Sequence, residues 1–253
     1  MTVSSSKDQF NANAGKYAVS DVHRAGPSLP VLLALAAPAS DDYALDVATG
    51  TGHTALAVAR YVKKGIGLDI ASKMLDQARA LAIEQGISNC EFVEGSAEAI
   101  PFASGRFSLV TARHAPHHFH RADLFLSEVR RVMTNKGRFV MADQITPSIE
   151  MLNWVNRWES TRDPSHFCQR TVEQWKLEAA KAGFRWIDHR IIPYRLEFAW
   201  WVKQAGCSDL TIGALAEHAA KASAFVRESF GLEFDESGRV VSFQEPMVVV
   251  RLE

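Results

Sequence analysis

The chain has 253 residues, 47% of them hydrophobic, so it can bury a full core as one α/β domain or as one domain with an insertion. Its 28 basic and 29 acidic side chains nearly cancel, which argues against nucleic acid or an anionic membrane as a partner and favours a small-molecule substrate. Three widely spaced cysteines (Cys90, Cys168 and Cys207) indicate neither a disulfide framework nor a zinc site. No run of about 18 apolar residues and no export signal is visible, so we expect a cytoplasmic protein without membrane insertion.

Short apolar runs alternate with longer segments of helical period between Tyr43 and Asp143, a pattern typical of βα units and a parallel sheet. The predicted strands are Tyr43–Ala48, Lys64–Ile70, Cys90–Glu94, Phe107–Ala112 and Gly137–Ala142. The predicted helices between them are His53–Val62, Ser72–Gln85 and Arg121–Met133. Parallel strands joined in this way require right-handed crossovers.

The composition changes after Asp143, because all six tryptophans follow that residue, and we expect inserted helices there. Thr171-Val-Glu-Gln174 reads as a capping box that opens a helix ending at Gly183. A further helix is predicted over Asp209–Phe230. The apolar runs Val240–Phe243 and Met247–Leu252 are predicted to be strands that complete the sheet after the helical insertion.

A glycine-rich turn follows the first predicted strand and is compatible with two cofactors. Gly50-Thr-Gly52-His-Thr-Ala55 satisfies the dinucleotide pattern G-x-G-x-x-A, and Asp69 ends the next strand, where a ribose-binding acid belongs, so NAD is a candidate. Asp46 precedes the turn and would repel a pyrophosphate, whereas it suits the ammonium group of S-adenosylmethionine. Without a ligand, the same residues would form a tight turn, with Asp69 capping the following helix.

Five motifs, which follow one another in a fixed order over most of the chain, bear on the choice between NAD and S-adenosylmethionine. They are Ala44-Leu-Asp-Val-Ala-Thr-Gly-Thr-Gly52, Gly67-Leu-Asp-Ile-Ala-Ser-Lys-Met-Leu75, Gly95-Ser-Ala-Glu-Ala-Ile-Pro-Phe102, Arg113 to Phe119, and Gly137-Arg-Phe-Val-Met-Ala-Asp143. Each is weak alone, but together they are specific. In them the chain resembles class I S-adenosylmethionine-dependent methyltransferases, in the branch that includes the ubiquinone and menaquinone biosynthesis enzymes.

The resemblance implies an α/β fold with a Rossmann-like, seven-stranded, mostly parallel sheet, helices on both faces and a helical cap inserted before the last strands. We expect a single domain over residues 1–253. Its parts are an N-terminal helical lid (1–40), a cofactor-binding core (41–145), a helical cap with a late strand (146–230) and terminal strands (231–253).

The resemblance also implies the cofactor site, position by position. The predicted S-adenosylmethionine contacts are Tyr17 in the N-terminal segment, Asp46, Ala48, Thr49, Gly50 and Gly52 in the turn, Asp69 at the ribose, Ile70, Met74, Ser96 and Ala97 at the adenine, and Arg113 and His114 beside them. Two positions depart from the usual pattern. Ala48 stands where the first glycine is common, and Ser96 stands where an aspartate would accept from the adenine amino group more strongly.

Four histidines follow the fourth predicted strand, where ligands bind in such sheets: His114, His117, His118 and His120. Histidine suits a general base near neutral pH, and we assign that role to His118 before His117. Alternatively, one of these two packs or caps the following helix, with Pro116 redirecting both. A metal site is the minor alternative, because no cysteine and no clear carboxylate ligand lies nearby in sequence, and we predict no metal.

A predicted cap helix carries Trp154 and Trp158 on one apolar stripe, and Arg162 continues that stripe. We predict that the two tryptophans form an aromatic wall for the substrate, that Arg162 holds an anionic or carbonyl group, and that His166 is a second polar contact. The alternative is structural: Asp163 caps a helix that begins at Pro164, and Arg162 pairs with Asp163 or Glu159.

The predicted function is S-adenosylmethionine-dependent methyl transfer to an oxygen, nitrogen or carbon atom of a small molecule, giving S-adenosylhomocysteine. An NAD-dependent oxidoreductase and a non-catalytic adenosyl-cofactor-binding protein are the alternatives. Nothing in the sequence indicates an oligomeric state.

Overall fold

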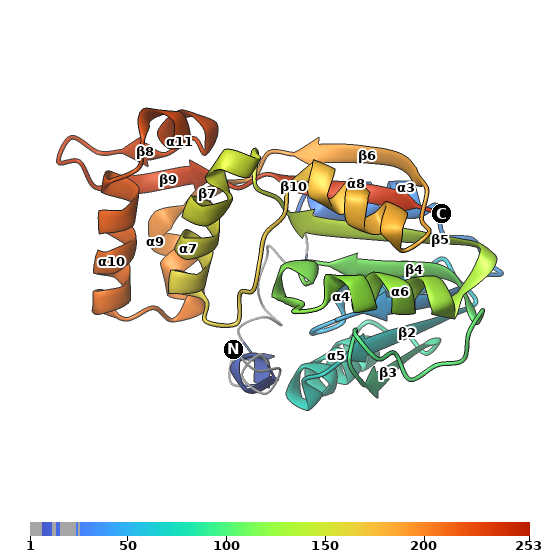
Figure 1. The fold of residues 1–253 in the computed structure, drawn as a ribbon. Coiled ribbons are helices and arrows are strands. Elements are labelled where there is room, and N and C mark those ends of the chain that lie inside the picture. The colour runs from blue at the N-terminus through green and yellow to red at the C-terminus, as the bar shows by residue number, and fades with distance from the viewer. Residues whose placement is uncertain (1–6, 12–13, 16–23, 25) are drawn as a thin grey trace.

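A seven-stranded sheet forms the larger part of the structure, a computed structural model that describes residues 7–11, 14–15, 24 and 26–253 (Figure 1). The strand order is β3-β2-β1-β4-β5-β10-β6. These strands are β1 (Tyr43–Val47), β2 (Lys64–Asp69), β3 (Cys90–Glu94), β4 (Phe107–Arg113), β5 (Met133–Gln144), β6 (Trp186–Ile192) and β10 (Met247–Leu252). Strands β1 to β5 pair in parallel, whereas β10 runs antiparallel to both β5 and β6. The predicted seven-stranded, mostly parallel sheet is therefore confirmed.

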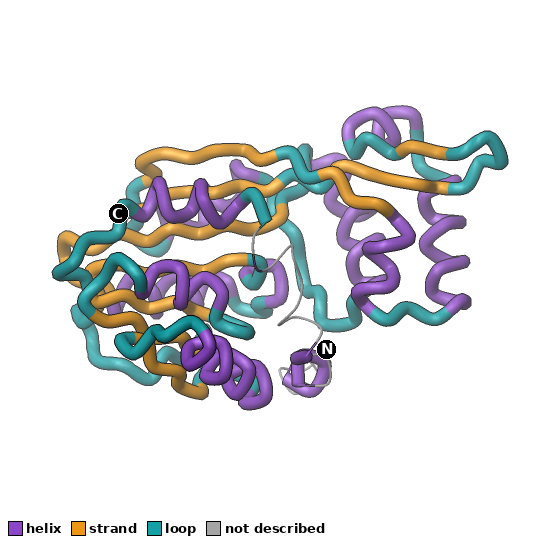
Figure 2. Tube along the Cα trace, turned by 180° about the vertical axis from the view of Figure 1, so that it is seen from behind, coloured by secondary structure: helices purple, strands orange, loops and turns teal. Residues whose placement is uncertain are grey.

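Helices cover both faces of this sheet (Figure 2). On one face, α6 (Ala122–Val132) and α8 (Val172–Lys181) contribute Phe125 and Trp175 to a core shared with the strands. The helices of the other face are α3 (Ser28–Ala36), α4 (His53–Ala59) and α5 (Ser72–Glu84). The predicted capping box of α8 is present, because Thr171 accepts from the N–H of Gln174 and the Gln174 side chain accepts from the N–H of Thr171.

Several predicted boundaries shift by one to a few residues, and two of the shifts illustrate the local reasons. Strand β1 ends at Val47, because Ala48 has a φ of 54° and leaves the extended conformation. Helix α6 ends at Val132, because β5 begins at Met133, earlier than the predicted Gly137.

Several segments that follow β5 form a cap beside the main sheet, on the left of Figure 1. The cap contains α7 (Leu152–Arg162), α9 (Phe198–Ala205), α10 (Asp209–Ala220), α11 (Ala224–Ser229) and a three-stranded sheet of β7 (Arg195–Glu197), β9 (Val240–Gln244) and β8 (Glu233–Phe234). Its own core packs the rings of Trp158, Trp201, Phe230 and Phe243.

Two predictions for this region are wrong. The run Val240–Phe243 does not complete the main sheet, because β9 pairs with β7 and β8 of the cap. The single helix predicted over Asp209–Phe230 is two helices, because Ser223 begins α11 as an N-cap that accepts from the N–H of Val226.

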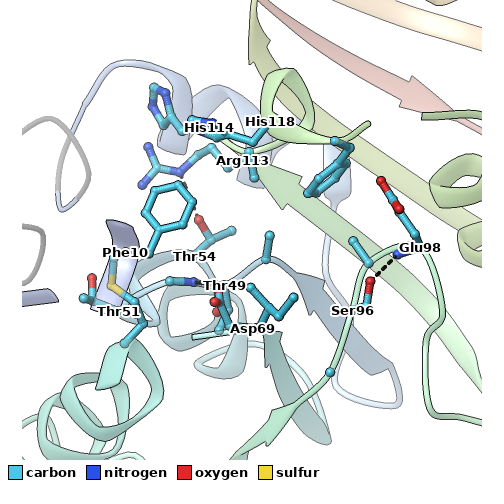
Figure 3. A pocket seen from close by; sticks show the side chains of 18 of the residues that line it. Phe10, Thr49, Thr51, Thr54, Asp69, Ser96, Glu98, Arg113, His114 and His118 are labelled. Carbon is cyan, nitrogen blue, oxygen red and sulfur yellow. Dashed lines mark hydrogen bonds between the residues drawn. The ribbon is translucent and has the colours of Figure 1, made fainter. Parts of the chain in front are cut away.

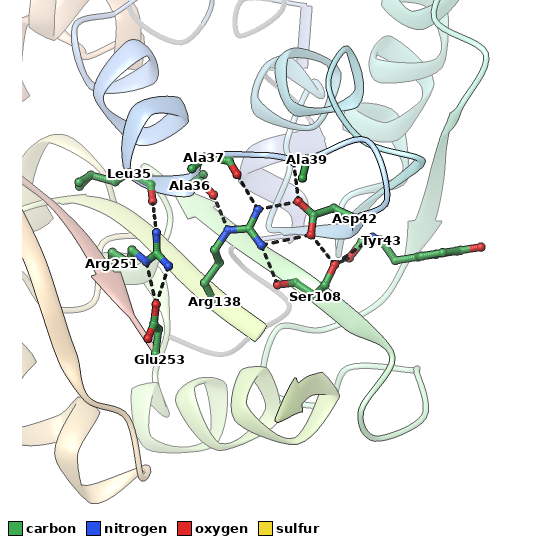
Figure 4. A network of polar contacts seen from close by, with 10 residues as sticks. All are labelled: Leu35, Ala36, Ala37, Ala39, Asp42, Tyr43, Ser108, Arg138, Arg251 and Glu253. Atoms are coloured by element: carbon green, nitrogen blue, oxygen red, sulfur yellow. Dashed lines mark hydrogen bonds and ion pairs between the residues drawn. The ribbon is translucent and has the colours of Figure 1, made fainter. Parts of the chain in front are cut away.

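A buried ion pair ties the amino ends of the strands together (Figure 4). Arg138 of β5 binds Asp42, which precedes β1, and donates to the carbonyl oxygens of Ala36 and Ala37 at the end of α3. Asp42 also accepts from the hydroxyl of Ser108 in β4 at 2.7 Å. These contacts fix the order of β1, β4 and β5 at the edge opposite to the pocket described below.

Along the described stretches of the chain, the apolar helices are all too short to cross a bilayer.

Candidate functional site

The main pocket opens at the carboxyl ends of β1, β2 and β4, where the strand order reverses, and spans about 1070 Å³ including space open to solvent. The predicted site residues that line it are Ala48, Thr49, Gly50, Asp69, Ile70, Met74, Ser96, Ala97, Arg113, His114 and His118. Figure 3 shows Arg113, His114 and His118 at the top of the pocket, with Thr49 and Asp69 below them. Asp46, Gly52 and His117 lie outside the lining, and Tyr17 lies outside the described residues.

The two glycines of the turn have different roles. Gly50 has a φ of 55°, and a Cβ placed on it would meet no atom within 4 Å, so the backbone is open on that side. Gly52 has a φ of 85°, and its Cβ would lie 2.8 Å from the Cβ of Ala78 in α5. Gly50 therefore lines the pocket, whereas Gly52 lets α5 pack closely against the turn.

Asp69 links the turn to α5 from the end of β2. Its carboxylate accepts from the N–H of Gly50 at 2.7 Å and from the N–H of Ala71 at 2.9 Å. Burial raises the pKa of Asp69 above its ordinary value, although these backbone hydrogen bonds oppose the rise. The carboxylate also borders the pocket, so its remaining lone pairs are placed to accept from hydroxyl groups.

Asp46 lies beneath the turn. One carboxylate oxygen accepts from the Thr49 hydroxyl and the other from the Thr111 hydroxyl, each at 2.7 Å. Burial raises the pKa of Asp46 to about 6. Asp46 therefore does not border the pocket itself. Its charge acts there at a distance and by orienting the hydroxyl of Thr49, which does line the pocket.

Arg113 brings a positive charge to the pocket from the end of β4. Its Nε donates to the Thr54 hydroxyl at 2.9 Å, and Nη1 donates to the Ser28 hydroxyl at 3.3 Å. Burial lowers the pKa of Arg113 to about 10, so the side chain is still charged at neutral pH. His114 adjoins it with a φ of 55° and contacts Ser28 through Nε2 at 3.4 Å. This end of the pocket suits a carboxylate.

The lining also includes the apolar side chains of Ile70, Met74 and Ala97. The Ser96 hydroxyl accepts from the N–H of Glu98 at 3.1 Å, so part of its hydrogen-bonding capacity goes to its own loop. Glu98 lines the pocket as well, although only Ser96 and Ala97 of the same motif were predicted as contacts.

Eight more described residues of the lining are not among the predicted site residues: Phe10, Thr51, His53, Thr54, Gly95, Ala115, Phe119 and His120. Five of them adjoin a predicted site residue along the chain (Thr51, His53, Gly95, Ala115 and Phe119), and His120 belongs to the group of histidines that follows the fourth predicted strand. Phe10 belongs to the helical residues 7–11, and its ring meets the ring of His118 edge to face at 5.1 Å.

The two candidate bases of the short helical turn η1 (Pro116–His118) have different hydrogen-bond partners, although the centroids of their rings lie only 4.1 Å apart. His117 points inward, and its Nδ1 lies 2.7 Å from a carboxylate oxygen of the fully buried Asp143. Burial alone would lower the pKa of His117, but the charge and hydrogen bond of Asp143 raise it. His117 is therefore held as one half of a buried ion pair.

His118 lines the pocket, and its Nδ1 lies 3.0 Å from the carbonyl oxygen of Ser165. Burial, followed by repulsion from the neighbouring His117, lowers the pKa of His118 well below its ordinary value. The ring is thus neutral at neutral pH with one nitrogen lone pair free, but the lowered pKa makes it a weaker base than an ordinary histidine. Within the described residues, no cluster of three or more histidine, cysteine or acidic side chains could bind a metal ion.

The predicted substrate residues of the cap do not line this pocket. Trp158 is buried in the cap core between Trp154 and Trp201, at ring distances of 5.4 and 4.9 Å. Arg162 lies over the Trp201 ring at 4.8 Å, and its Nη1 is 3.9 Å from Glu159, the pairing considered as an alternative. His166 approaches the site most closely, because its ring stacks on that of His117 at 5.7 Å, while its Nε2 contacts Asn156 at 2.8 Å.

Comparison with known proteins agrees with this architecture. Residues 45–141 match the family model described as a methyltransferase domain. The chain is 31% identical over 237 residues to the uncharacterized methyltransferase YcgJ of Bacillus subtilis, covering 92% of this chain and 93% of the relative. It is 30% identical to the ubiquinone/menaquinone biosynthesis C-methyltransferase UbiE of Brucella anthropi, covering 79% and 78%. The crystal structure of YcgJ superposes with a TM-score of 0.84 at 29% identity, covering 89% of this chain and 97% of that structure.

Proposed function

The chain belongs to the class I S-adenosylmethionine-dependent methyltransferases, and from that premise we propose that it methylates a small-molecule acceptor with His118 as the general base. The observation that carries the proposal is the position of His118. Its ring borders the same pocket as Asp69 and the glycine turn, and its Nδ1 is occupied by the carbonyl of Ser165. The Nε2 atom is thus the ring nitrogen that can receive a proton from a methyl acceptor in the pocket.

The residues of the pocket fit S-adenosylmethionine. The open backbone at Gly50 accommodates its amino-acid portion, and the carboxylate of Asp69 is suited to the ribose hydroxyls. Ile70, Met74 and Ala97 offer an apolar wall for the adenine, and the charged Arg113 complements the carboxylate. When bound, the cofactor supplies a methyl group on a positively charged sulfur, which is already activated for displacement.

The protein's own contribution is alignment and proton removal. A methyl acceptor held beside His118 would lose its proton to Nε2 while its oxygen, nitrogen or carbon atom takes the methyl group, whose bond to the cofactor sulfur breaks as the sulfur keeps the electron pair. The imidazolium that results lies close to Asp163, whose charge favours the protonated form of His118. The family membership makes an NAD-dependent oxidoreductase unnecessary to explain the glycine turn.

Binding is tested first. We expect calorimetry to detect S-adenosylhomocysteine but not NADH. Asp69→Asn should weaken S-adenosylhomocysteine binding about 10- to 100-fold, because hydrogen bonds to a charged group contribute about 1.5–3 kcal/mol. The exposed neighbour of β1, Asp41, supplies the control: Asp41→Asn should bind like the wild type. Equal affinity of the wild-type protein for NADH would contradict the cofactor assignment.

The base is tested with methyl-labelled S-adenosylmethionine and a metabolite extract, in which the labelled small molecule identifies the acceptor. His118→Gln should lower label transfer about 100-fold or more, since general bases contribute roughly 10²- to 10⁴-fold. Binding of S-adenosylhomocysteine should persist in this variant. His189→Gln on the edge strand β6 is the matched control. Undiminished transfer by His118→Gln would reject His118 as the base, and label in protein or nucleic acid would reject the small-molecule acceptor.

A further inference from the structure

The turn that follows α7 makes close polar contacts with His118. The side chain of Asp163 accepts from the N–H of Ser165 at 2.8 Å and from its hydroxyl at 2.6 Å, both at Oδ1. The carbonyl oxygen of Ser165 lies 3.0 Å from Nδ1 of His118, and the hydroxyl of Ser165 lies 3.3 Å from the same atom. Asp163 therefore fixes the conformation of the residue that contacts the pocket histidine.

A second set of contacts holds this turn against η1. The backbone N–H groups of Phe167 and Cys168 both donate to the carbonyl oxygen of His117, at 3.0 and 2.9 Å. The N–H of Asp163 in turn donates to the carbonyl of Glu159 at 2.8 Å, which anchors the turn to the end of α7. The Ser165 carbonyl thus has little freedom to move away from His118.

These contacts determine the tautomer of His118. A backbone carbonyl can only accept a hydrogen bond, so Nδ1 must carry the proton in the neutral ring. The other nitrogen, Nε2, then bears the lone pair. It has no hydrogen-bond partner among the residues that the structure describes.

We propose that Asp163 and Ser165 are positioning residues that hold His118 as the Nδ1-protonated tautomer, with the lone pair of Nε2 available to the acceptor. The inference rests on the proposed function for the use of that lone pair, but the tautomer itself can be measured without an acceptor. Asp163 is 6% exposed and lies outside the pocket lining, so its hydrogen bonds act on the His118 ring through Ser165, while its charge also acts on that ring directly. Neither residue touches the reacting atoms in this arrangement.

The direct test is NMR of the full-length protein with ¹⁵N-labelled histidine, in which protonated and unprotonated ring nitrogens have distinct shifts. The signals of His118 are assigned by their loss in His118→Gln. We expect Nδ1–H in the wild-type protein. A wild-type ring protonated at Nε2 would overturn the proposal, whatever the variants do.

The variants test the cause of the tautomer. Asp163→Ala should shift His118 toward the Nε2-protonated form, and Asp163→Asn, which keeps a carbonyl oxygen as acceptor, should largely restore Nδ1–H. Ser165→Ala keeps the backbone carbonyl and loses the hydroxyl bond to Asp163, so it should shift the tautomer less than Asp163→Ala. Ser160→Ala, on the exposed side of α7, is its control. An unchanged tautomer in both Asp163→Ala and Ser165→Ala would overturn the proposal.

Activity separates this inference from the function on which it rests. Asp163→Ala should lower kcat for label transfer about 10- to 100-fold, with the KM for S-adenosylmethionine unchanged, because misplacing a reacting group has effects of this size. Asp163→Asn should recover most of that loss. If His118→Gln abolishes transfer but Asp163→Ala changes neither kcat nor the tautomer, the positioning role of Asp163 is wrong and the assignment of His118 as general base stands. If His118→Gln transfers normally, the base is wrong, and the NMR result still decides the tautomer.

Discussion

Two buried aspartates at the carboxyl edge of the sheet differ in what they bind. Asp69 accepts from the backbone N–H groups of Gly50 and Ala71, whereas Asp46 accepts from the hydroxyls of Thr49 and Thr111. Burial raises the pKa of both, and for Asp46 the rise reaches about 6. A threonine hydroxyl can rotate and bond to a carboxyl group in either protonation state, so the site of Asp46 tolerates a proton.

This raised pKa predicts how Asp46 affects stability. In the unfolded chain the carboxyl ionises near its ordinary value of 3.8, and in the folded protein only near 6. The stabilisation from Asp46 is therefore complete below pH 4, is lost as the pH rises toward 6, and is absent at pH 7. The loss amounts to about 3 kcal/mol, at roughly 1.4 kcal/mol per pKa unit.

Urea unfolding of the wild type and Asp46→Asn between pH 4 and pH 7 measures this effect. Because asparagine does not titrate, the free energy of unfolding of the wild type relative to the variant should fall by about 3 kcal/mol over this range. The difference cancels the titration of groups common to both proteins. A difference that does not change with pH would contradict the raised pKa.

At the scale of helices and strands, glycine is required at position 52 and unfavourable at position 213. Gly52 begins α4 in a left-handed conformation and packs against Ala78 of α5. Gly213 lies on the exposed side of α10, where a Cβ would meet no atom within 4 Å. Helix α10 therefore carries the entropic disadvantage of glycine without a packing reason.

The two glycines should respond to alanine in opposite directions. Gly52→Ala should lower the free energy of unfolding by about 2–4 kcal/mol, through a left-handed φ and a Cβ 2.8 Å from Ala78. Gly213→Ala should raise it by up to about 1 kcal/mol. Thermal and urea unfolding check both, and destabilisation by Gly213→Ala would mean that an unseen contact covers that side of α10.

At the scale of the molecule, the main domain and the cap have separate cores. The cap core includes Trp158, Trp201 and Phe243, whereas the described pocket residues belong to the main domain and to the helical residues 7–11. The segment after α7 connects the two parts through its contacts with η1. A defect inside the cap core should therefore affect stability more than cofactor affinity.

Phe243→Ala tests this separation. The ring is fully buried and contacts Trp158, Trp201 and Phe230, so its removal should lower the free energy of unfolding by about 3–5 kcal/mol. Calorimetry in the cold, where the variant is folded, should give nearly wild-type affinity for S-adenosylhomocysteine. Val241→Ala, on the exposed side of the same strand, is the control. Cofactor affinity that falls in parallel with stability would show that the two parts are coupled.

Much of the fold could be predicted because its signals are local. The apolar runs of β1 to β4, the positive-φ glycine at position 50 and the capping box at Thr171 each depend on a few neighbouring residues. The family and the seven-stranded sheet were predicted from the resemblance carried by the five ordered motifs, and both are confirmed. The partner of β9 was mispredicted, because an apolar strand pattern does not encode which sheet the strand joins.

The sequence by itself determined the cofactor class, because Asp46 before the glycine turn and the five ordered motifs favour S-adenosylmethionine, whereas the turn and Asp69 alone are also compatible with NAD. Only the tertiary structure decided which histidine faces the pocket. His117 and His118 are adjacent residues of the same type. They differ in the structure because His117 contacts Asp143, 26 residues away along the chain, whereas His118 contacts Ser165, 47 residues away. The tertiary structure likewise placed Trp158 in the cap core. Hydrogen bonds and packing between distant segments set these roles, and no local pattern encodes them.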